Sequence, residues 1–383
     1  MPADVYEQLL KIPPAQLADL ALAGLERQGR MIAQVLEGVQ EQLGSVIGAT
    51  HAERIYLTGC GDSYFAALSA CCAFEQLTGL PTVALESMEL AHYTLLRPDT
   101  LVIAISSTGE AARTLEASRV ARQAGCNVVG ITAHKDSRLT QESPCLVAVP
   151  NLAGGDHIDQ AALILGNFCF SLAALYRIAI HMGRRCNHLE QPMDKIETEI
   201  NAIPHAITEA VNRSAAIRAY LDGVSDEADF YFLGAGPSFG VALFYQAKFF
   251  EQARRPVYGV ELEEFAHEQF SLLRPGKKAQ VWFIVPQGHS QERAIEIMAG
   301  CREMGAHVVA ITTQGGQLEG NADISFFTEA VPEMFSPLVS VVPGELVGIH
   351  AFARWGSESS FASSRDRQVK ASKRLTREGE KNL

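Results

Sequence analysis

The sequence predicts an α/β protein made of two tandem copies of one domain, each a parallel β-sheet flanked by helices on both faces. Short runs rich in β-branched residues alternate with longer runs of helical spacing, which is typical of such sheets. The same order of motifs is written twice, and 383 residues are enough for two domains of ordinary size.

Three pairs of segments carry the repeat. They are IYLTGCGDSYFAAL from Ile55 and FYFLGAGPSFGVAL from Phe230, ESMELAHYTL at 86–95 and ELEEFAHEQF at 261–270, and AGCNVVGIT at 124–132 and MGAHVVAIT at 304–312. Because the offset between the copies drifts by only a few residues, we interpret the chain as a duplicated domain.

The repeat sets the expected division of the chain. It consists of an N-terminal helical segment at 1–49, a first domain at 50–183, a helical connector at 184–224, a second domain at 225–358 and a polar tail at 359–383. The elements expected in the first domain are strands at 53–59, 99–105, 127–133 and 145–151 and a helix at 112–125. The apolar window 161–180 contains Asn167 and Arg177, so we expect a buried helix there and no membrane span.

Composition limits the classes of partner and the compartment. The net charge of −12 argues against nucleic acid or an anionic membrane as the main partner. The eight cysteines form no C-x-x-C pair and lie mostly in apolar runs, so we expect buried, reduced thiols. The N-terminus has no cationic start followed by an apolar core. We therefore predict a cytoplasmic protein with no metal site and no cofactor.

Two loops follow strands of the first domain, at the edge where parallel sheets bind ligands. In the first, TGCGDSYFAA at 58–67, Gly59 and Gly61 allow close approach of the backbone, and Ser63 stands where a helix begins. The Ser63 hydroxyl can cap that helix or bind an anion at its positive end, and the sequence leaves both uses open.

The second loop, ISSTGEAART at 105–114, places Ser106, Ser107 and Thr108 in succession before a glycine and a helix. Three hydroxyls and the amides of a helix start can surround a phosphate without a cationic side chain. The corresponding loop of the second copy reads VPQGHSQE, where Pro286 has no amide hydrogen. We therefore expect a phosphate site in the first domain alone.

The doubled layout, GCGDS, SSTGE and the Glu…Glu-x-x-His segment resemble the tandem sugar isomerase (SIS) fold from about residue 50 to about residue 376. The resemblance is to the isomerase half of glucosamine-6-phosphate synthase, to the aminosugar-phosphate deaminases and to the fructosamine-6-phosphate deglycases. It implies an enzyme that moves a proton between C1 and C2 of an aminosugar phosphate or a fructosamine phosphate, with deamination or deglycation. Since the chain opens MPADVYEQ, without a nucleophilic cysteine, we expect no glutaminase activity.

The resemblance also implies which residues hold the substrate. The positions that match the family's phosphate-binding residues are Gly61, Ser63 and the hydroxyl-bearing Ser106, Ser107 and Thr108. The family has a further threonine at the end of this loop, and here that position is Ala111.

Catalysis is assigned by the resemblance to the second copy. Glu251 corresponds to the family's base, and His267, sixteen residues later, to the histidine that opens the sugar ring in a neighbouring subunit. A homodimer that shares the histidine segment is therefore expected. A partly desolvated carboxylate suits proton transfer between carbons, and histidine suits a proton shuttle near neutral pH. The family's glycine-proline after the histidine is Glu268-Gln269 here.

Glu75 and His92 are the counterparts of these residues in the first copy, and we expect them to serve a dimer or inter-domain contact. In the tail, ASKRLT resembles the family segment in which a lysine folds over the sugar. This implies Lys373 as a catalytic amine, with Lys370 as the second candidate.

Two alternatives from other classes remain open. A phosphosugar-sensing protein would keep the hydroxyl loop without needing Glu251 and His267 together. A non-catalytic structural relative would be consistent with Ala111 and with the lost glycine-proline.

Overall fold

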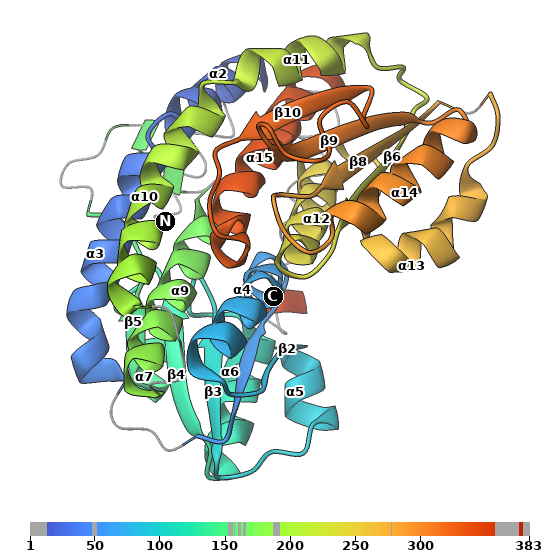
Figure 1. Cartoon of the computed structure of the whole chain (residues 1–383). Coiled ribbons are helices and arrows are strands. Elements are labelled where there is room, and N and C mark those ends of the chain that lie inside the picture. The colour runs from blue at the N-terminus through green and yellow to red at the C-terminus, as the bar shows by residue number, and fades with distance from the viewer. Residues whose placement is uncertain are drawn as a thin grey trace.

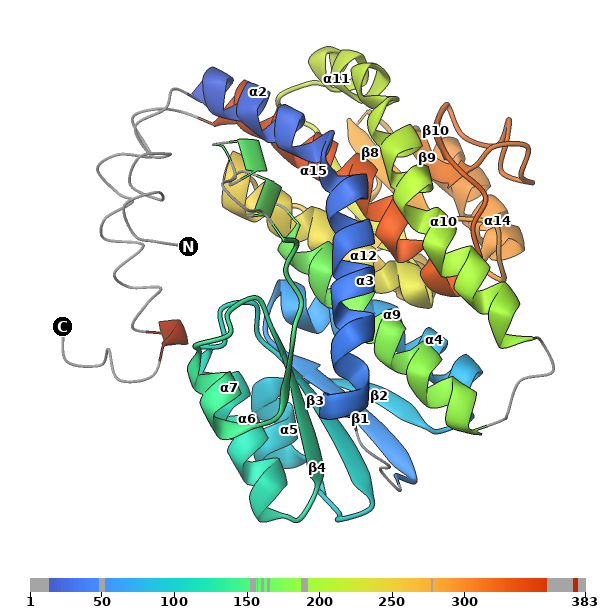
Figure 2. The ribbon, with the colours of Figure 1, turned by 90° about the vertical axis from the view of Figure 1, so that its left-hand side faces the viewer.

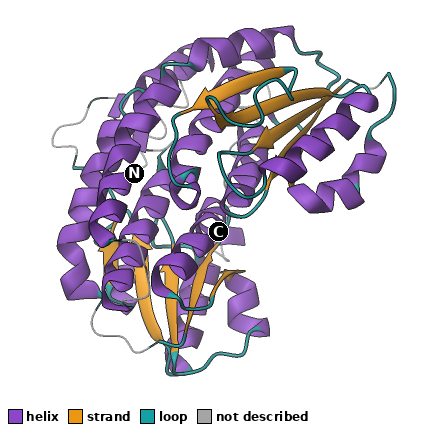
Figure 3. Cartoon of the chain, viewed as in Figure 1, coloured by secondary structure: helices purple, strands orange, loops and turns teal. Residues whose placement is uncertain are grey.

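The computed structural model describes residues 14–47, 52–151, 156, 158–159, 162–163, 166–186, 192–276, 278–356 and 375–377. The described residues form two five-stranded sheets, and each sheet is wholly parallel. The sheets lie at opposite ends of the described structure, with helices on their faces (Figures 1 and 3). The predicted α/β fold with two parallel sheets is confirmed.

The first sheet has the strand order β2-β1-β3-β4-β5. Its strands are β1 (Arg54–Gly59), β2 (Thr82–Glu86), β3 (Thr100–Ile105), β4 (Asn127–Thr132) and β5 (Cys145–Val147). The helices that follow them are α4 (Asp62–Thr78), α5 (Ser87–Tyr93), α6 (Ala112–Gln123), α7 (Arg138–Glu142) and α9 (Asn167–Cys186). The four strands and the helix expected from the sequence are present; β2 was not predicted, because this edge strand is short and half-exposed.

The second sheet has the order β10-β9-β8-β6-β7, which repeats the first arrangement. Its strands are β6 (Asp229–Gly234), β7 (Tyr258–Glu261), β8 (Ala279–Ile284), β9 (His307–Thr313) and β10 (Ile324–Thr328). The helices are α12 (Pro237–Lys248), a π-helical turn η1 (Phe249–Ala253), α13 (Leu262–His267), 3₁₀ turns η2 (Gln269–Leu272) and η3 (Glu333–Phe335), α14 (Gln291–Glu303) and α15 (Pro337–Trp355).

Within the described residues, four further helices connect and flank the domains. They are α2 (Pro14–Leu25), α3 (Gln28–Val46), α10 (Met193–Val211) and α11 (Ser214–Gly223). Figure 2 shows α3 and α10 running side by side, and both contact the buried helix α9. Within the described residues, no helix combines the length and the apolarity that crossing a membrane requires.

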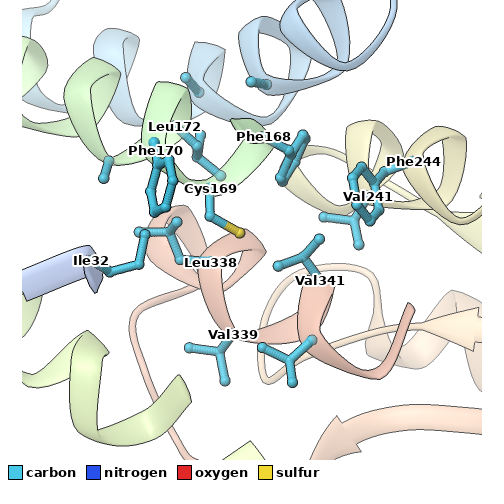
Figure 4. Packing of buried hydrophobic residues seen from close by; sticks show 14 of the residues in the cluster. Ile32, Phe168, Cys169, Phe170, Leu172, Val241, Phe244, Leu338, Val339 and Val341 are labelled. Atoms are coloured by element: carbon cyan, nitrogen blue, oxygen red, sulfur yellow. The ribbon is translucent and has the colours of Figure 1, made fainter. Parts of the chain in front are cut away.

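The two domains share one hydrophobic core. Its centre is formed by α3, α9, α12 and α15, whose buried side chains interdigitate in Figure 4. The rings of Phe168 from α9 and Phe244 from α12 lie 4.8 Å apart. Each fully buried side chain of this size contributes about 1.5–3 kcal/mol. This core fixes α12 of the second domain against α4 of the first, which positions the site described below.

The cysteines are free thiols. Cys126, Cys169 and Cys301 are buried, as expected, whereas Cys186 at the end of α9 is exposed. The remaining four are half-buried. The expectation of buried thiols therefore holds only for some of them.

Candidate active site

The glycine loop between β1 and α4 has a backbone conformation that requires glycine. Gly61 has φ +56°, and its counterpart Gly236 in the second domain has φ +52°. A side chain at Gly59 would place its Cβ 2.7 Å from the Cβ of Ser63, so the turn is tight. Gly61 is the N-cap residue of α4, and no side chain caps this helix. Ser63 therefore lies in the first turn without a capping role, and its hydroxyl can serve an anion.

The hydroxyl loop follows β3 and is closed by a backbone hydrogen bond from the amide of Gly109 to the carbonyl of Ser106 at 2.8 Å. Gly109 has φ +66°, and an added Cβ would lie 2.1 Å from Oγ of Ser137. Within the described part of the chain, the amides of Ser107 and Thr108 donate to no acceptor. Two unbonded amides beside hydroxyls are donors that a small anion could use.

Partners from distant parts of the chain hold the hydroxyls of this loop. Oγ of Ser107 donates to Oδ1 of Asn167, at the start of α9, at 2.8 Å. Oγ1 of Thr108 accepts from Nη1 of Arg377 at 2.5 Å. Ser106 itself is buried. The loop is thus fixed in place, and it carries a cation that the sequence-based assignment did not include.

The described part of the tail, residues 375–377, reaches this loop. Arg377 forms an isolated antiparallel bridge with Ala111, and the segment lies beside the first domain in Figure 2. Lys373 and Lys370 lie outside the described residues. The basic composition of the tail was the one available signal for Arg377, but it does not single out this arginine from its neighbours.

Glu251 lies on the π-helical turn η1, which continues α12 by five residues. Short π-helical turns within helices are rare and are frequent at functional sites. Arg254, three residues after Glu251, has φ +55°, and it is the one described non-glycine residue with a positive φ. The Glu251 side chain is 58% exposed in the single chain, so the expected desolvation is not provided by this chain alone.

Lys248 connects Glu251 to the glycine loop. Its Nζ lies 2.6 Å from Oε2 of Glu251 and 2.9 Å from Oδ2 of Asp62, the residue between Gly61 and Ser63. Burial alone would lower the pKa of Lys248, but the two carboxylates raise it above its ordinary value, so the amine stays charged. The ion pairs bring the expected base of one domain to the expected phosphate loop of the other.

Lys248 was not among the residues chosen from the sequence. Its position three residues before Glu251 on a helix was a usable signal, because residues at that spacing are neighbours on a helix surface. Its partner Asp62 comes from a segment far away in the chain, and only the packing of α4 against α12 brings them together.

A buried acid, Glu345 of α15, lies in the same region of the core. Nε2 of Gln28 donates to Oε1 of Glu345 at 2.8 Å, and the second oxygen has no partner among the described residues. Burial raises the pKa of Glu345 to about 8, against smaller opposing effects of the Gln28 hydrogen bond and the charge of Lys248. At neutral pH this carboxyl group is therefore largely protonated.

His267 is placed at the end of α13, away from these contacts. Its side chain is 70% exposed, and Nε2 lies 3.2 Å from Oε1 of Glu263. Arg293 binds the other oxygen of this carboxylate, with its Nε 2.7 Å from Oε2. Among the described residues, no hydrogen bond or ion pair joins His267 to Glu251. At Glu268-Gln269, the chain leaves α13 and enters the 3₁₀ turn η2.

The repeated Glu…His segment has a structural role in both copies. Glu86 and Glu261 are the N-caps of α5 and α13, and their carboxylates accept backbone amides of the first turn. Glu75 accepts the amide of Thr82 at 3.0 Å. His92 lies 3.2 Å from a carboxylate oxygen of α6. These contacts lie inside the first domain, so the expected inter-domain role is not found in the described chain, and a dimer role stays a prediction.

Among the described residues, no three histidine, cysteine or acidic side chains are grouped so that they could hold a metal ion.

The SIS domain profile matches residues 50–161 and 224–354, which is more than half of the chain. The protein belongs to the SIS domain family. The two matched regions coincide with the two parallel sheets, so each sheet with its helices is one SIS domain.

Sequence relatives of this SIS protein include two glutamine–fructose-6-phosphate aminotransferases (isomerizing). The one from Tropheryma whipplei (strain TW08/27) is 26% identical over 351 residues, which are 89% of this chain and 54% of the relative. The one from Methanothermobacter thermautotrophicus is 28% identical over 328 residues, 83% of this chain and 51% of the relative. The chain thus spans about half the length of these relatives.

Solved structures share the fold. The C-terminal domain of glucosamine-fructose-6-phosphate aminotransferase from Francisella tularensis superposes with a TM-score of 0.72 at 18% identity, over 86% of this chain and 96% of the other. Glucosamine-6-phosphate deaminase from Thermotoga maritima gives 0.66 at 20% identity, over 89% and 97%.

Proposed function

We propose that this SIS protein is a sugar-phosphate isomerase-type enzyme that acts on an aminosugar phosphate or a fructosamine phosphate and releases the amine by deamination or deglycation. The observation that carries the proposal is the chain of ion pairs Asp62–Lys248–Glu251. It joins a candidate base on one domain to a candidate phosphate loop on the other.

The phosphate is held by the first domain. Ser63, the hydroxyls of residues 106–108 and the unbonded amides of Ser107 and Thr108 surround it. Arg377, which already donates to Thr108, adds a positive charge at a loop where Ala111 lacks the family's hydroxyl. A charge-assisted hydrogen bond of this kind is about twice as strong as a neutral one.

Glu251 is the base. It takes a proton from one of the carbons C1 and C2 of the open-chain sugar, and the electrons move onto the carbonyl oxygen. The proton returns to the neighbouring carbon while the proton of the other oxygen passes to the former carbonyl oxygen, so the carbonyl group moves by one carbon. The charge of Lys248, 2.6 Å from this carboxylate, stabilises the negative oxygen of the enediolate between the two steps. When the substrate carries an amine, the same carbonyl shift creates the imine whose hydrolysis releases it.

We infer that the enzyme works as a homodimer in which His267 acts in the partner's site. The exposed position of His267, with no described contact to Glu251 in its own chain, supports this arrangement. Large apolar side chains are exposed on and beside α5 and α13, two elements that occupy equivalent places in the two domains. They are Met88, Tyr93, Leu95, Tyr258 and Leu272. Association over this surface would bury them.

Lys373, or Lys370 in its place, is the proposed amine that attacks the open-chain carbonyl or assists ring opening. It precedes the segment that contacts the hydroxyl loop through Arg377, so the tail approaches the phosphate end of the proposed substrate.

The test is solvent-deuterium incorporation at C1 or C2 during incubation with glucosamine-6-phosphate and with fructosamine-6-phosphates, together with assays of released amine. Glu251→Gln keeps the size of the side chain but cannot accept the proton, and we expect exchange to fall about 10²–10⁴-fold. The matched control is Glu75→Gln at the equivalent position of the first copy, where a glutamine oxygen can still accept the Thr82 amide. Wild-type exchange in Glu251→Gln, or binding of sugar phosphates without any exchange in the wild type, would contradict the proposal.

A further inference from the structure

A cavity of about 350 Å³ lies at the carboxyl edge of the second sheet, and Cys72 and Gln76 of α4 close it from the first domain. Its lining includes Gly236, Ser290, Arg293 and Glu333. Gly236 is the counterpart of Gly61, and Ser290 precedes α14 as Ala111 precedes α6. The cavity therefore occupies, in the second domain, the place where the first domain has its glycine loop and hydroxyl loop.

The loop after β8 is the structural equivalent of the hydroxyl loop. The amide of Val285 donates to a carbonyl of β9 at 2.9 Å, as the amide of Ser106 donates to β4 at 2.9 Å. Counting on from these two residues, Gly288 corresponds to Gly109. Each loop follows the middle strand of its own sheet, β3 or β8, and leads into a helix.

In the second domain, two amides of this loop are bonded within the protein. Pro286 has no amide hydrogen. The amide of Gln287 donates to Oγ1 of Thr313 at 3.1 Å. The amide of His289 donates to the Glu333 carboxylate, with 3.3 Å to Oε1 and 3.2 Å to Oε2. At the two positions equivalent to Ser107 and Thr108, the second domain therefore offers no free amide, whereas the first domain offers two.

Glu333 comes from the 3₁₀ turn η3, between β10 and α15, and its side chain is 22% exposed. A Cβ added at Gly288 would lie 2.1–2.4 Å from its carboxylate atoms, so the carboxylate rests directly on the glycine. A negative charge is thus fixed at the start of α14, where a bound anion would gain most from the helix end. A phosphate in this cavity would meet a like charge, and the loop positions equivalent to Ser107 and Thr108 have no free amide to donate to it.

We propose that Glu333 is a specificity-determining residue of the second domain. Its carboxylate occupies the position at the start of α14 where a phosphate would bind, and it therefore excludes phosphorylated sugars from the cavity. Each chain then holds a single phosphosugar, in the first domain; this last point rests on the proposed function. The second copy has therefore not only lost the hydroxyl groups of the loop. It also carries a carboxylate that excludes phosphate.

The experiment counts bound inorganic phosphate and bound glucosamine-6-phosphate per chain by equilibrium dialysis, in the wild type and in Glu333→Ala. We expect one site per chain in the wild type and two in the variant. Glu333→Gln, which removes the charge but keeps an oxygen acceptor for the His289 amide, is the second variant should the alanine variant not fold. Glu303→Ala, at an exposed position of α14, is the control and should keep one site. A folded Glu333 variant with the wild-type number of sites, or two sites in the wild type, would overturn the proposal.

A second arm separates this proposal from the proposed function. In a Ser106→Ala, Thr108→Val background, which weakens the first site, Glu333→Ala should restore one phosphate per chain. If the wild type binds no phosphosugar at all, the proposed function fails, but the gain of a phosphate site between wild type and Glu333→Ala still decides the role of Glu333.

A stability measurement tests the contact independently of binding. Gly288→Ala places a methyl group against the Glu333 carboxylate, so it should lower the Tm in the wild type and lower it much less in Glu333→Ala. Equal losses in the two backgrounds would show that the carboxylate does not rest on this loop.

Discussion

Replacing Glu345 with glutamine should make the protein less sensitive to alkaline pH. In the folded protein, burial raises the pKa of this carboxyl group to about 8, whereas in the unfolded chain it returns to its ordinary value near 4.5. Between these two values the folded state binds a proton that the unfolded state has released. Stability from this group is therefore complete below the unfolded pKa and is lost as pH rises toward the folded pKa.

The magnitude follows from the size of the shift. One pKa unit corresponds to about 1.4 kcal/mol, so the difference between the two states amounts to about 5 kcal/mol at most. Between about pH 5 and about pH 9, the wild type should lose up to about 4 kcal/mol that Glu345→Gln does not lose. Glutamine has nearly the same shape and keeps an oxygen for the hydrogen bond from Gln28, so the variant creates no cavity.

The assay is urea unfolding of both proteins across this pH range, with the difference in unfolding free energy as the readout. The control is Glu303→Gln on the exposed surface of α14, which should follow the wild type at every pH. If the difference between wild type and Glu345→Gln is constant from acid to alkaline pH, Glu345 does not titrate with a raised pKa and the reasoning is refuted.

Three further predictions concern the candidate site. Ser106→Ala combined with Thr108→Val should weaken sugar-phosphate binding by about 1–3 kcal/mol for each acceptor left unpaired, and calorimetry showing equal affinity for glucose and glucose-6-phosphate in the wild type would contradict it. Arg377→Ala should weaken binding of the phosphorylated sugar by about 1.5–3 kcal/mol and reduce its salt dependence; an unchanged Kd across a salt series would remove Arg377 from the site. Mixing inactive Glu251→Gln with inactive His267→Ala should restore some turnover through hybrid dimers, whereas no recovery in heterodimers shown to form would place each site within one chain.

Much of the architecture was predictable because it is written in local patterns. Strand-forming runs such as the one that ends at Gly59, and hydroxyls in succession at residues 106–108, identify a parallel sheet and its ligand edge without any knowledge of distant contacts. The edge strand β2 escaped prediction, because short and half-exposed strands have weak hydrophobic patterns. The glutamate that begins each Glu…His segment was interpretable only as a repeat until the structure showed it to be a helix cap.

The sequence by itself determined the duplicated α/β fold, the family and the two loops of the first domain, since each depends on residues that are neighbours in the chain. Only the tertiary structure decided which side chains meet. Lys248 reaches Asp62 across 186 positions, Arg377 reaches Thr108 across 269, and the Glu333 carboxylate occupies a loop 44 residues before it. The packing of α12 against α4 through a shared apolar core produces the first of these contacts. Hydrophobic burial is non-directional. A sequence pattern therefore shows which faces of helices and strands must be covered, but it does not show which polar groups meet once those faces are packed.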